Sequence, residues 1–83
     1  MKVILNTTGT FSNTYNIYKL ARGVFNYQDH EGIDIDYEHK LDESSSVTIT
    51  FVEFSWRETT KLDELTALIR LLLPEAGEKL WTI

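Results

Sequence analysis

The sequence contains no cysteine, one proline and four glycines in its 83 residues. Without cysteine, the chain has no disulfide, no thiolate ligand for zinc and no cysteine nucleophile. Small secreted domains often depend on disulfides, so this lack favours a reducing, cytoplasmic setting. Long apolar runs are absent too. The N-terminal run is too short for a signal peptide, and segment 65–73 is interrupted by Arg70 and ended by Pro74, so we predict no membrane span.

Basic residues are also scarce. The chain has eight Lys and Arg against thirteen Asp and Glu, which leaves a net charge of −5, and the basic residues are scattered along it. Because contacts with phosphates need clustered Lys and Arg, nucleic acid is disfavoured as a direct ligand. Hydrophobic residues make up 42% of the chain, which argues against disorder and predicts one packed domain over residues 1–83.

Two segments have the pattern of amphipathic helices. The first helix is expected to begin at Ser12 or Asn13, either of which is a suitable N-cap. The second is expected to be capped by Thr60, with Asp63 completing a variant of the capping box, and to end at Pro74. The first helix is predicted to place Ile17, Leu20, Ala21, Val24 and Gln28 on one face, and the buried stripe of the second to contain Leu62, Leu65, Leu68, Ile69 and Leu72.

Four strands complete the expected β-α-β-β-α-β order. They are residues 2–6, followed by a turn over 7–10, then 32–40, 47–54 and 79–83. This order predicts a ferredoxin-like α+β fold, a four-stranded, mostly antiparallel sheet with two helices on one face. In that topology the apolar first and third strands lie centrally, and the half-charged second strand lies at an edge. The predicted core consists of Val3, Leu5, Ile17, Leu20, Val24, Ile33, Ile35, Val47, Ile49, Phe51, Leu65, Ile69 and Leu72.

Negative charge is concentrated between Glu31 and Glu43, where six carboxylates accompany a single lysine, Lys40. The strict alternation after Gly32 directs Ile33, Ile35 and Tyr37 toward the helices and Asp34, Asp36 and Glu38 toward the open side of the sheet. Two explanations remain open. The carboxylates are either a solvated edge that blocks edge-to-edge association, or a surface that binds a partner.

We expect neither metal binding nor catalysis at these carboxylates. Two of them could share Mg²⁺ or Ca²⁺ with His39, Asp42 or Glu43, but the spacing does not match a calcium loop. Elsewhere, segment 6–13 lacks the lysine of a phosphate-binding loop and the spaced glycines of a dinucleotide site. Neither His30 nor His39 belongs to a recognisable catalytic arrangement. We therefore expect no enzyme activity, no metal and no cofactor.

A second question is whether several aromatic side chains are exposed as part of an interface or are buried. Continued alternation along the third strand places Phe54 and Trp56 on the open sheet face, where a large apolar patch would indicate an interface. The alternative is a bulge after Phe51 that turns Phe54 or Trp56 inward. Tyr15, Tyr18 and Phe25 on the first helix pose the same question, because at least Tyr18 falls outside the main buried stripe.

Two function classes fit these observations. The first is a small acidic, non-catalytic protein-binding module, an inhibitor or antagonist of the anti-restriction, anti-CRISPR or immunity type. Such a module presents carboxylates, in place of phosphates, to a basic, nucleic-acid-handling partner. The second is a homo-oligomeric accessory or ligand-sensing domain, for instance a homodimer. For the first class, the expected partner-binding residues are Asp34, Asp36, Glu38, Asp42, Glu43, Phe54 and Trp56.

Overall fold

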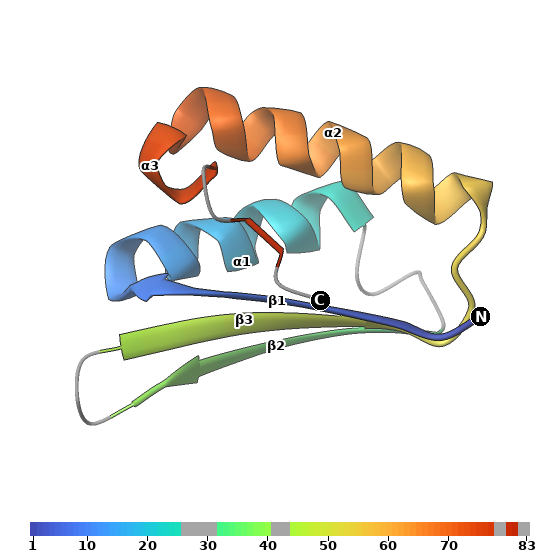
Figure 1. Cartoon of the computed structure of the whole chain (residues 1–83), viewed down its shortest axis with the longest axis horizontal. Helices are drawn as coiled ribbons and strands as arrows, with labels where there is room; N and C mark the ends of the chain where they lie inside the picture. The colour runs from blue at the N-terminus through green and yellow to red at the C-terminus, as the bar shows by residue number, and fades with distance from the viewer. Residues whose placement is uncertain (26–31, 41–43, 78–79, 82–83) are drawn as a thin grey trace.

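The computed structural model describes residues 1–25, 32–40, 44–77 and 80–81. Figure 1 shows the arrangement of the helices and strands. Their bounds are β1 Val3–Thr10, α1 Phe11–Phe25, β2 Ile33–His39, β3 Ser44–Phe51, α2 Trp56–Leu72 and α3 Pro74–Gly77.

The strands form a three-stranded sheet in the order β1-β3-β2. Both β1 and β2 pair antiparallel with β3, with Ile49 of β3 between Leu5 and Ile35. β1 and β2 therefore run parallel to each other on either side of β3, and α1 lies between them in the chain. The prediction that the acidic strand lies at an edge is confirmed, since β2 pairs only with β3 among the described residues.

The predicted four-stranded ferredoxin-like sheet is wrong. The described chain has three strands, and β1, which was expected to be central, forms the second edge. Of the expected fourth strand, Lys79, Thr82 and Ile83 lie outside the described residues, and Leu80 and Trp81 belong to no strand. Trp81 has a φ of 58°, in the left-handed region that extended chains do not use.

A hydrogen bond explains where the C-terminal segment goes. The indole N–H of Trp81 donates to the hydroxyl of Thr66 in α2 at 3.1 Å. Leu80 and Trp81 are both partly buried against the hydrophobic core. The apolar residues that suggested a strand are therefore used in packing, with Trp81 bonded to a helix.

The helices are stacked on one side of the sheet. α1 contacts all three strands, whereas α2 contacts α1 and α3 and lies farther from the sheet (Figure 1). α1 is therefore covered on both sides, which explains why Ile17, Ala21 and Phe25 are almost completely buried.

The hydrophobic core largely matches the predicted one. Its buried members are Leu5, Ile17, Ala21, Phe25, Ile33, Ile35, Val47, Ile49, Phe51, Leu65 and Ile69. Val3, Leu20 and Val24 are partly buried beside it. The prediction for Leu72 is wrong, because this residue at the end of α2 is 57% exposed. Burying side chains of this size contributes about 1.5–3 kcal/mol each, so these residues dominate the stability.

The turn predicted at residues 7–10 is wrong, because β1 continues through them. Thr7, Thr8 and Gly9 pair with Val47, Ser46 and Ser45 of β3. Threonine is well suited to strands, and the presence of a pairing partner outweighs the turn signal of one glycine. α1 follows directly at Phe11, and the expected caps Ser12 and Asn13 lie inside it.

Thr10 takes the capping role at the start of α1. Its hydroxyl accepts a hydrogen bond from the backbone N–H of Asn13 at 3.2 Å. The helix therefore begins as soon as the strand ends, with no intervening loop.

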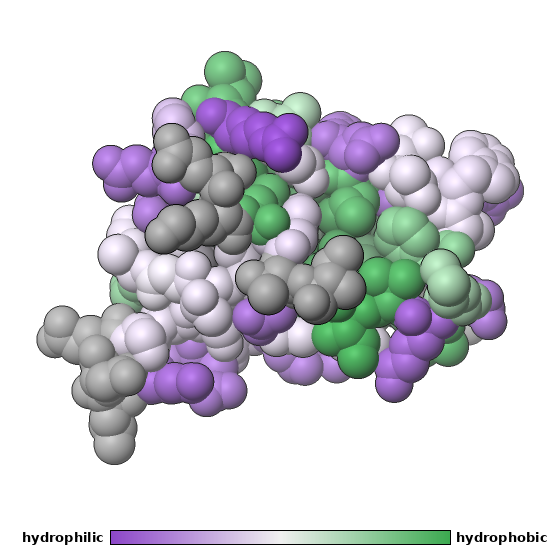
Figure 2. Space-filling view, viewed as in Figure 1, coloured by the Kyte–Doolittle hydropathy of each residue, from purple (hydrophilic) through white to green (hydrophobic). Residues whose placement is uncertain are grey.

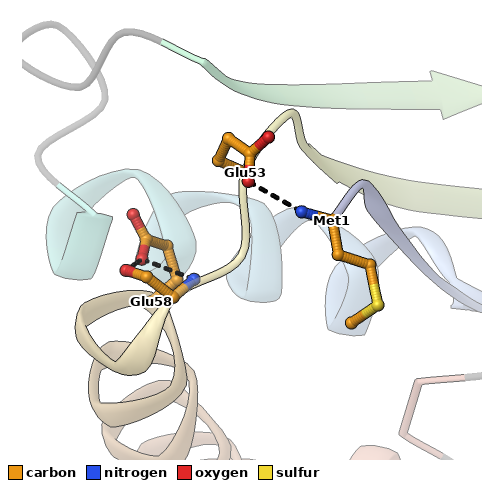
Figure 3. A network of polar contacts seen from close by, with 4 residues as sticks. Met1, Glu53 and Glu58 are labelled. Carbon is orange, nitrogen blue, oxygen red and sulfur yellow. Dashed lines mark hydrogen bonds and ion pairs between the residues drawn. The ribbon is translucent and has the colours of Figure 1, made fainter.

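The start of α2 also differs from the prediction. Its N-cap is Ser55, and the carboxylate of Glu58 accepts hydrogen bonds from the backbone N–H of Ser55, at 3.0 Å, and from its hydroxyl (Figure 3). The predicted cap, Thr60, lies inside the helix and donates to the carbonyl of Trp56 at 3.0 Å. Ser-x-x-Glu is the complete capping box, so it fixes the start of the helix one turn earlier.

Candidate protein-binding surface

The predicted alternation along β2 is confirmed. Ile33 and Ile35 are buried, whereas Asp34, Asp36 and Glu38 are exposed. The three carboxylates therefore form a row, here called the acidic row, on the side of the sheet away from α1. Neighbouring members of the row are about 6–7 Å apart along the strand.

The strands beside the acidic row add polar, uncharged side chains. Asp34, Asp36 and Glu38 lie opposite Thr50, Thr48 and Ser46 of β3. Beyond these, β1 contributes Ile4, Asn6 and Thr8, and the amide of Asn6 donates to the hydroxyl of Thr48 at 2.9 Å. Within β1, β2 and β3 this face includes no basic side chain, and the exposed Lys40, the next residue of the same parity after Glu38, follows the acidic row just beyond β2. In Figure 2, hydrophilic side chains line the lower margin under the sheet, and hydrophobic ones gather toward the N-terminal end between the sheet and α2.

The carboxylates of the acidic row influence one another. The pKa of Asp36 is raised above its ordinary value, mainly by the negative charge of Asp34, then by partial loss of hydration and by a hydrogen bond with Asp34. Two like charges at neighbouring positions of one strand disfavour the ionised form. A cation placed over this pair would relieve the repulsion.

Of the remaining predicted binding residues, Phe54 and Trp56 lie within the described chain. Asp42 and Glu43 fall outside the described residues. Phe54 does not lie on the open face, because β3 ends at Phe51 and the chain bends at Val52 and Glu53. The ring of Phe54 packs against the ring of Phe51, with centroids 5.0 Å apart. The alternative in which Phe54 turns inward is therefore right, although a bend after the strand, and not a bulge within it, produces the turn.

Trp56 also departs from the predicted sheet face. It is the first residue of α2 and is 73% exposed. The guanidinium of Arg57 lies 5.6 Å from the centroid of its ring. Trp56 therefore has the exposure that a binding residue needs but lies on a helix, apart from the acidic row, and its role in binding stays a prediction.

The structure brings five rings together beside β2. This aromatic cluster consists of Phe11, Tyr15, Tyr18, Tyr37 and His39. Phe11 stacks on Tyr15 with centroids 5.7 Å apart, and its ring also lies 4.9 Å from that of His39. Tyr37 of β2 contacts three of the helix rings, at centroid distances of 5.6 to 6.1 Å. The cluster lies on the helix side of the edge strand, opposite the acidic row.

The aromatic cluster is only partly covered and carries positive charge at its margin. Phe11 is 47% and Tyr15 is 42% exposed. The ammonium of Lys19 lies 5.4 Å from the centroid of Tyr15, and the guanidinium of Arg22 lies 5.5 Å from that of Tyr18. Such cation–π contacts are worth about 0.5–1 kcal/mol at exposed sites. The sequence drew attention to Tyr15 and Tyr18, whereas Phe11, which precedes the predicted helix start, and the strand members Tyr37 and His39 were missed.

Tyr37 contains a polar atom without a partner. Its hydroxyl is buried and makes no hydrogen bond within the described part of the chain. A buried, unsatisfied hydroxyl costs about 1–3 kcal/mol. The ring of Tyr37 therefore holds the cluster together by packing alone.

The described residues were expected to hold no metal ion. Within them, no three His, Asp or Glu side chains gather closely enough to hold a metal ion. His39 belongs to the aromatic cluster, and His30 lies outside the described residues. None of the described helices is long and apolar enough to cross a membrane.

Comparisons with protein-family models, with curated proteins and with solved structures found no significant match.

Proposed function

We propose that this chain is a non-catalytic protein-binding domain whose acidic row recognises a basic surface of a protein partner. The observation that carries this proposal is the exposure of Asp34, Asp36 and Glu38 on one side of an edge strand. The residues of β1 and β3 on that face provide no basic side chain, Lys40 follows only at the end of the row, and the pKa of Asp36 is raised chiefly by the charge of Asp34. Basic groups of a partner would relieve this repulsion and gain charge complementarity.

Carboxylates spaced along an extended strand resemble the charges of a nucleic-acid backbone in sign and regularity. We propose on this ground that the partner is a nucleic-acid-handling protein and that the domain acts as its inhibitor. The support is the sign and placement of the charges.

The acidic row is tested by the triple reversal Asp34→Lys, Asp36→Lys and Glu38→Lys. Because all three side chains are exposed, each change should alter the free energy of unfolding by only about 0.5 kcal/mol. The wild-type domain would serve as bait in lysate of the source cell, and each protein that it retains would be purified. The triple reversal should slow the association of such a protein sharply in low salt. Its association with the wild type should slow sharply as salt rises, because the Debye length falls from about 10 Å at 0.1 M to about 3 Å at 1 M.

The matched control is the reversal of three exposed carboxylates on the helices, Asp63→Lys, Glu64→Lys and Glu75→Lys, which changes the net charge equally. It should leave partner association almost unchanged. If both triple variants associate with the partner at the wild-type rate in low salt, the acidic row is only a solvated edge.

A homodimer that pairs exposed surfaces is the alternative, and the exposure of Phe11 and Tyr15 favours it. Sedimentation at micromolar concentration distinguishes the two. A stable dimer that protects these rings from solvent would support the homo-oligomeric accessory or ligand-sensing domain, and a monomer supports the binding module.

A further inference from the structure

The outer edge of β2 has its own set of hydrogen-bonding groups. The backbone N–H of Val52 donates to the carbonyl of Gly32 at 2.8 Å, and that of Lys40 donates to the carbonyl of Ser44 at 2.9 Å. Gly32–Val52 and Lys40–Ser44 are therefore hydrogen-bonded pairs of the antiparallel ladder. Because such pairs occur at every second residue, the backbone groups of Asp34, Asp36 and Glu38 also bond to β3. The N–H and C=O groups of the other residues, Ile33, Ile35, Tyr37 and His39, point to the outer edge, where no described segment pairs with them.

The two sides of this edge differ in chemistry. On the open side of the sheet lies the acidic row, and on the helix side lies the aromatic cluster with the partly exposed Phe11 and Tyr15. A strand added to β2 would continue the pleat, so its side chains would point alternately to the two sides. Directly opposite side chains on adjacent strands lie about 4.5–5.5 Å apart, close enough for charges and rings to interact.

The charges on the two sides of β2 determine which kind of strand could pair with its outer edge. A second copy of β2 would bring its own acidic row to the same side of the extended sheet, and like charges directly opposite each other destabilise strand pairing. Basic residues on the helix side are disfavoured as well, because Lys19 and Arg22 already lie over the rings of Tyr15 and Tyr18. Basic residues on the open side, alternating with apolar or aromatic residues on the helix side, satisfy both sides.

We infer that β2 accepts an extended segment of the partner as an added strand, with alternating basic and apolar side chains. This inference rests on the proposed function and specifies how the acidic row is used. The backbone groups of Ile35 and Tyr37 would supply the binding energy that does not depend on sequence, and the two rows of side chains would supply register and specificity.

The test uses two synthetic peptides of identical composition, one that alternates Lys with Val and Tyr, and one in which the lysines form a single block. Binding is measured by calorimetry at up to millimolar peptide, together with amide hydrogen exchange of the domain. The alternating peptide should bind at least tenfold more tightly than the block peptide. It should slow exchange at the amides of Ile35, Tyr37 and His39, while the amides of Asp36 and Glu38, already bonded to β3, should change little.

Variants provide the controls. In the triple reversal of the acidic row, preference should switch to an alternating peptide in which Glu replaces Lys, which a merely unfolded variant would not show. Tyr15→Ala should weaken binding of the lysine peptide about tenfold, whereas Leu71→Ala, which alters a residue that is 75% exposed on α2, should not change it.

The outcomes separate the inference from the proposed function. Equal binding of the two peptides, or binding without slower exchange at Ile35 and Tyr37, would overturn strand addition and leave the acidic row as a binding surface for basic groups. If neither peptide binds and the partner's association is insensitive to the triple reversal, both proposals are wrong.

Discussion

The ring of Phe25, at the end of α1, meets the ring of Phe51, at the end of β3, edge to face, with centroids 5.3 Å apart and an interplanar angle of 64°. Both side chains are completely buried. Phe51 also contacts Phe54, so three rings connect the first helix, the central strand and the chain that leads into α2. This contact joins the helix layers to the sheet.

Removing this contact should destabilise the domain strongly. Phe25→Ala is expected to lower the free energy of unfolding in urea by about 3–5 kcal/mol, because a large side chain is lost from a packed interior. Leu72→Ala, at a position that is 57% exposed, should change it by only about 0.5 kcal/mol. If the Leu72 variant lost as much stability as the Phe25 variant, the exposed position of Leu72 at the end of α2 would be incorrect.

The cap of α2 gives a second prediction. Ser55→Ala should cost about 0.5–2 kcal/mol, since it removes the N-cap of a long helix. Thr60→Ala should be neutral or slightly stabilising, because this residue lies inside the helix and alanine has the higher helix propensity. Thermal unfolding of the two variants decides between the two start sites, and a loss confined to the Thr60 variant would place the cap there.

The unsatisfied hydroxyl of Tyr37 gives a third prediction. Tyr37→Phe should leave stability unchanged or raise it, since it removes a buried oxygen without a partner and keeps the ring. The matched comparison is Thr14→Val. The hydroxyl of Thr14 is buried but donates to the carbonyl of Thr10 at 2.8 Å, so its loss should cost about 1 kcal/mol. A marked loss of stability in Tyr37→Phe would mean that its hydroxyl has a hydrogen-bond partner.

The acidic row gives a prediction about pH. Because the pKa of Asp36 is raised in the folded state, the folded chain binds the proton more tightly than the unfolded chain does. The contribution of Asp36 to the stability of the folded domain is therefore greatest below the ordinary carboxyl pKa, and it is lost as the pH rises through the folded-state pKa. Carboxyl titration by NMR should show the raised pKa, and Asp34→Asn should return it toward its ordinary value. Glu75→Gln, a change on the distant α3, should have no effect. An unchanged pKa of Asp36 in Asp34→Asn would show that the two carboxylates do not interact.

Local patterns predicted much of the fold. The alternation in β2 identified both its buried side and its acidic row, and the helical periodicity identified most of the residues that bury α1 and α2. Such patterns are interpreted correctly because a strand or helix that is buried on one side has apolar residues at the regular spacing of that side. There are two exceptions. Leu72 continued the helical pattern past the end of the surface that α2 covers, and Phe25, which is completely buried, was left out of the predicted core.

The aromatic cluster shows where sequence reasoning stopped. Tyr15 and Tyr18 were recognised in the sequence as aromatic residues of the first helix, but Phe11 was placed before that helix, whereas α1 begins at Phe11. That Tyr37 and His39 join them depends on how α1 packs beside β2, which is a contact between elements and not a property of either one.

By itself, the sequence determined the alternating acidic strand, the two amphipathic helices and the excess of negative charge, since these depend only on residue type and spacing. Tertiary structure decided the number of strands, because Trp81, in a left-handed backbone conformation, donates to Thr66 in α2 and not to the edge of β1. It also decided that β1 extends through Thr10, where pairing with β3 supplies hydrogen bonds that a turn would not. In each case a partner distant in the chain outweighed the local preference, and that partner exists only once the chain is folded.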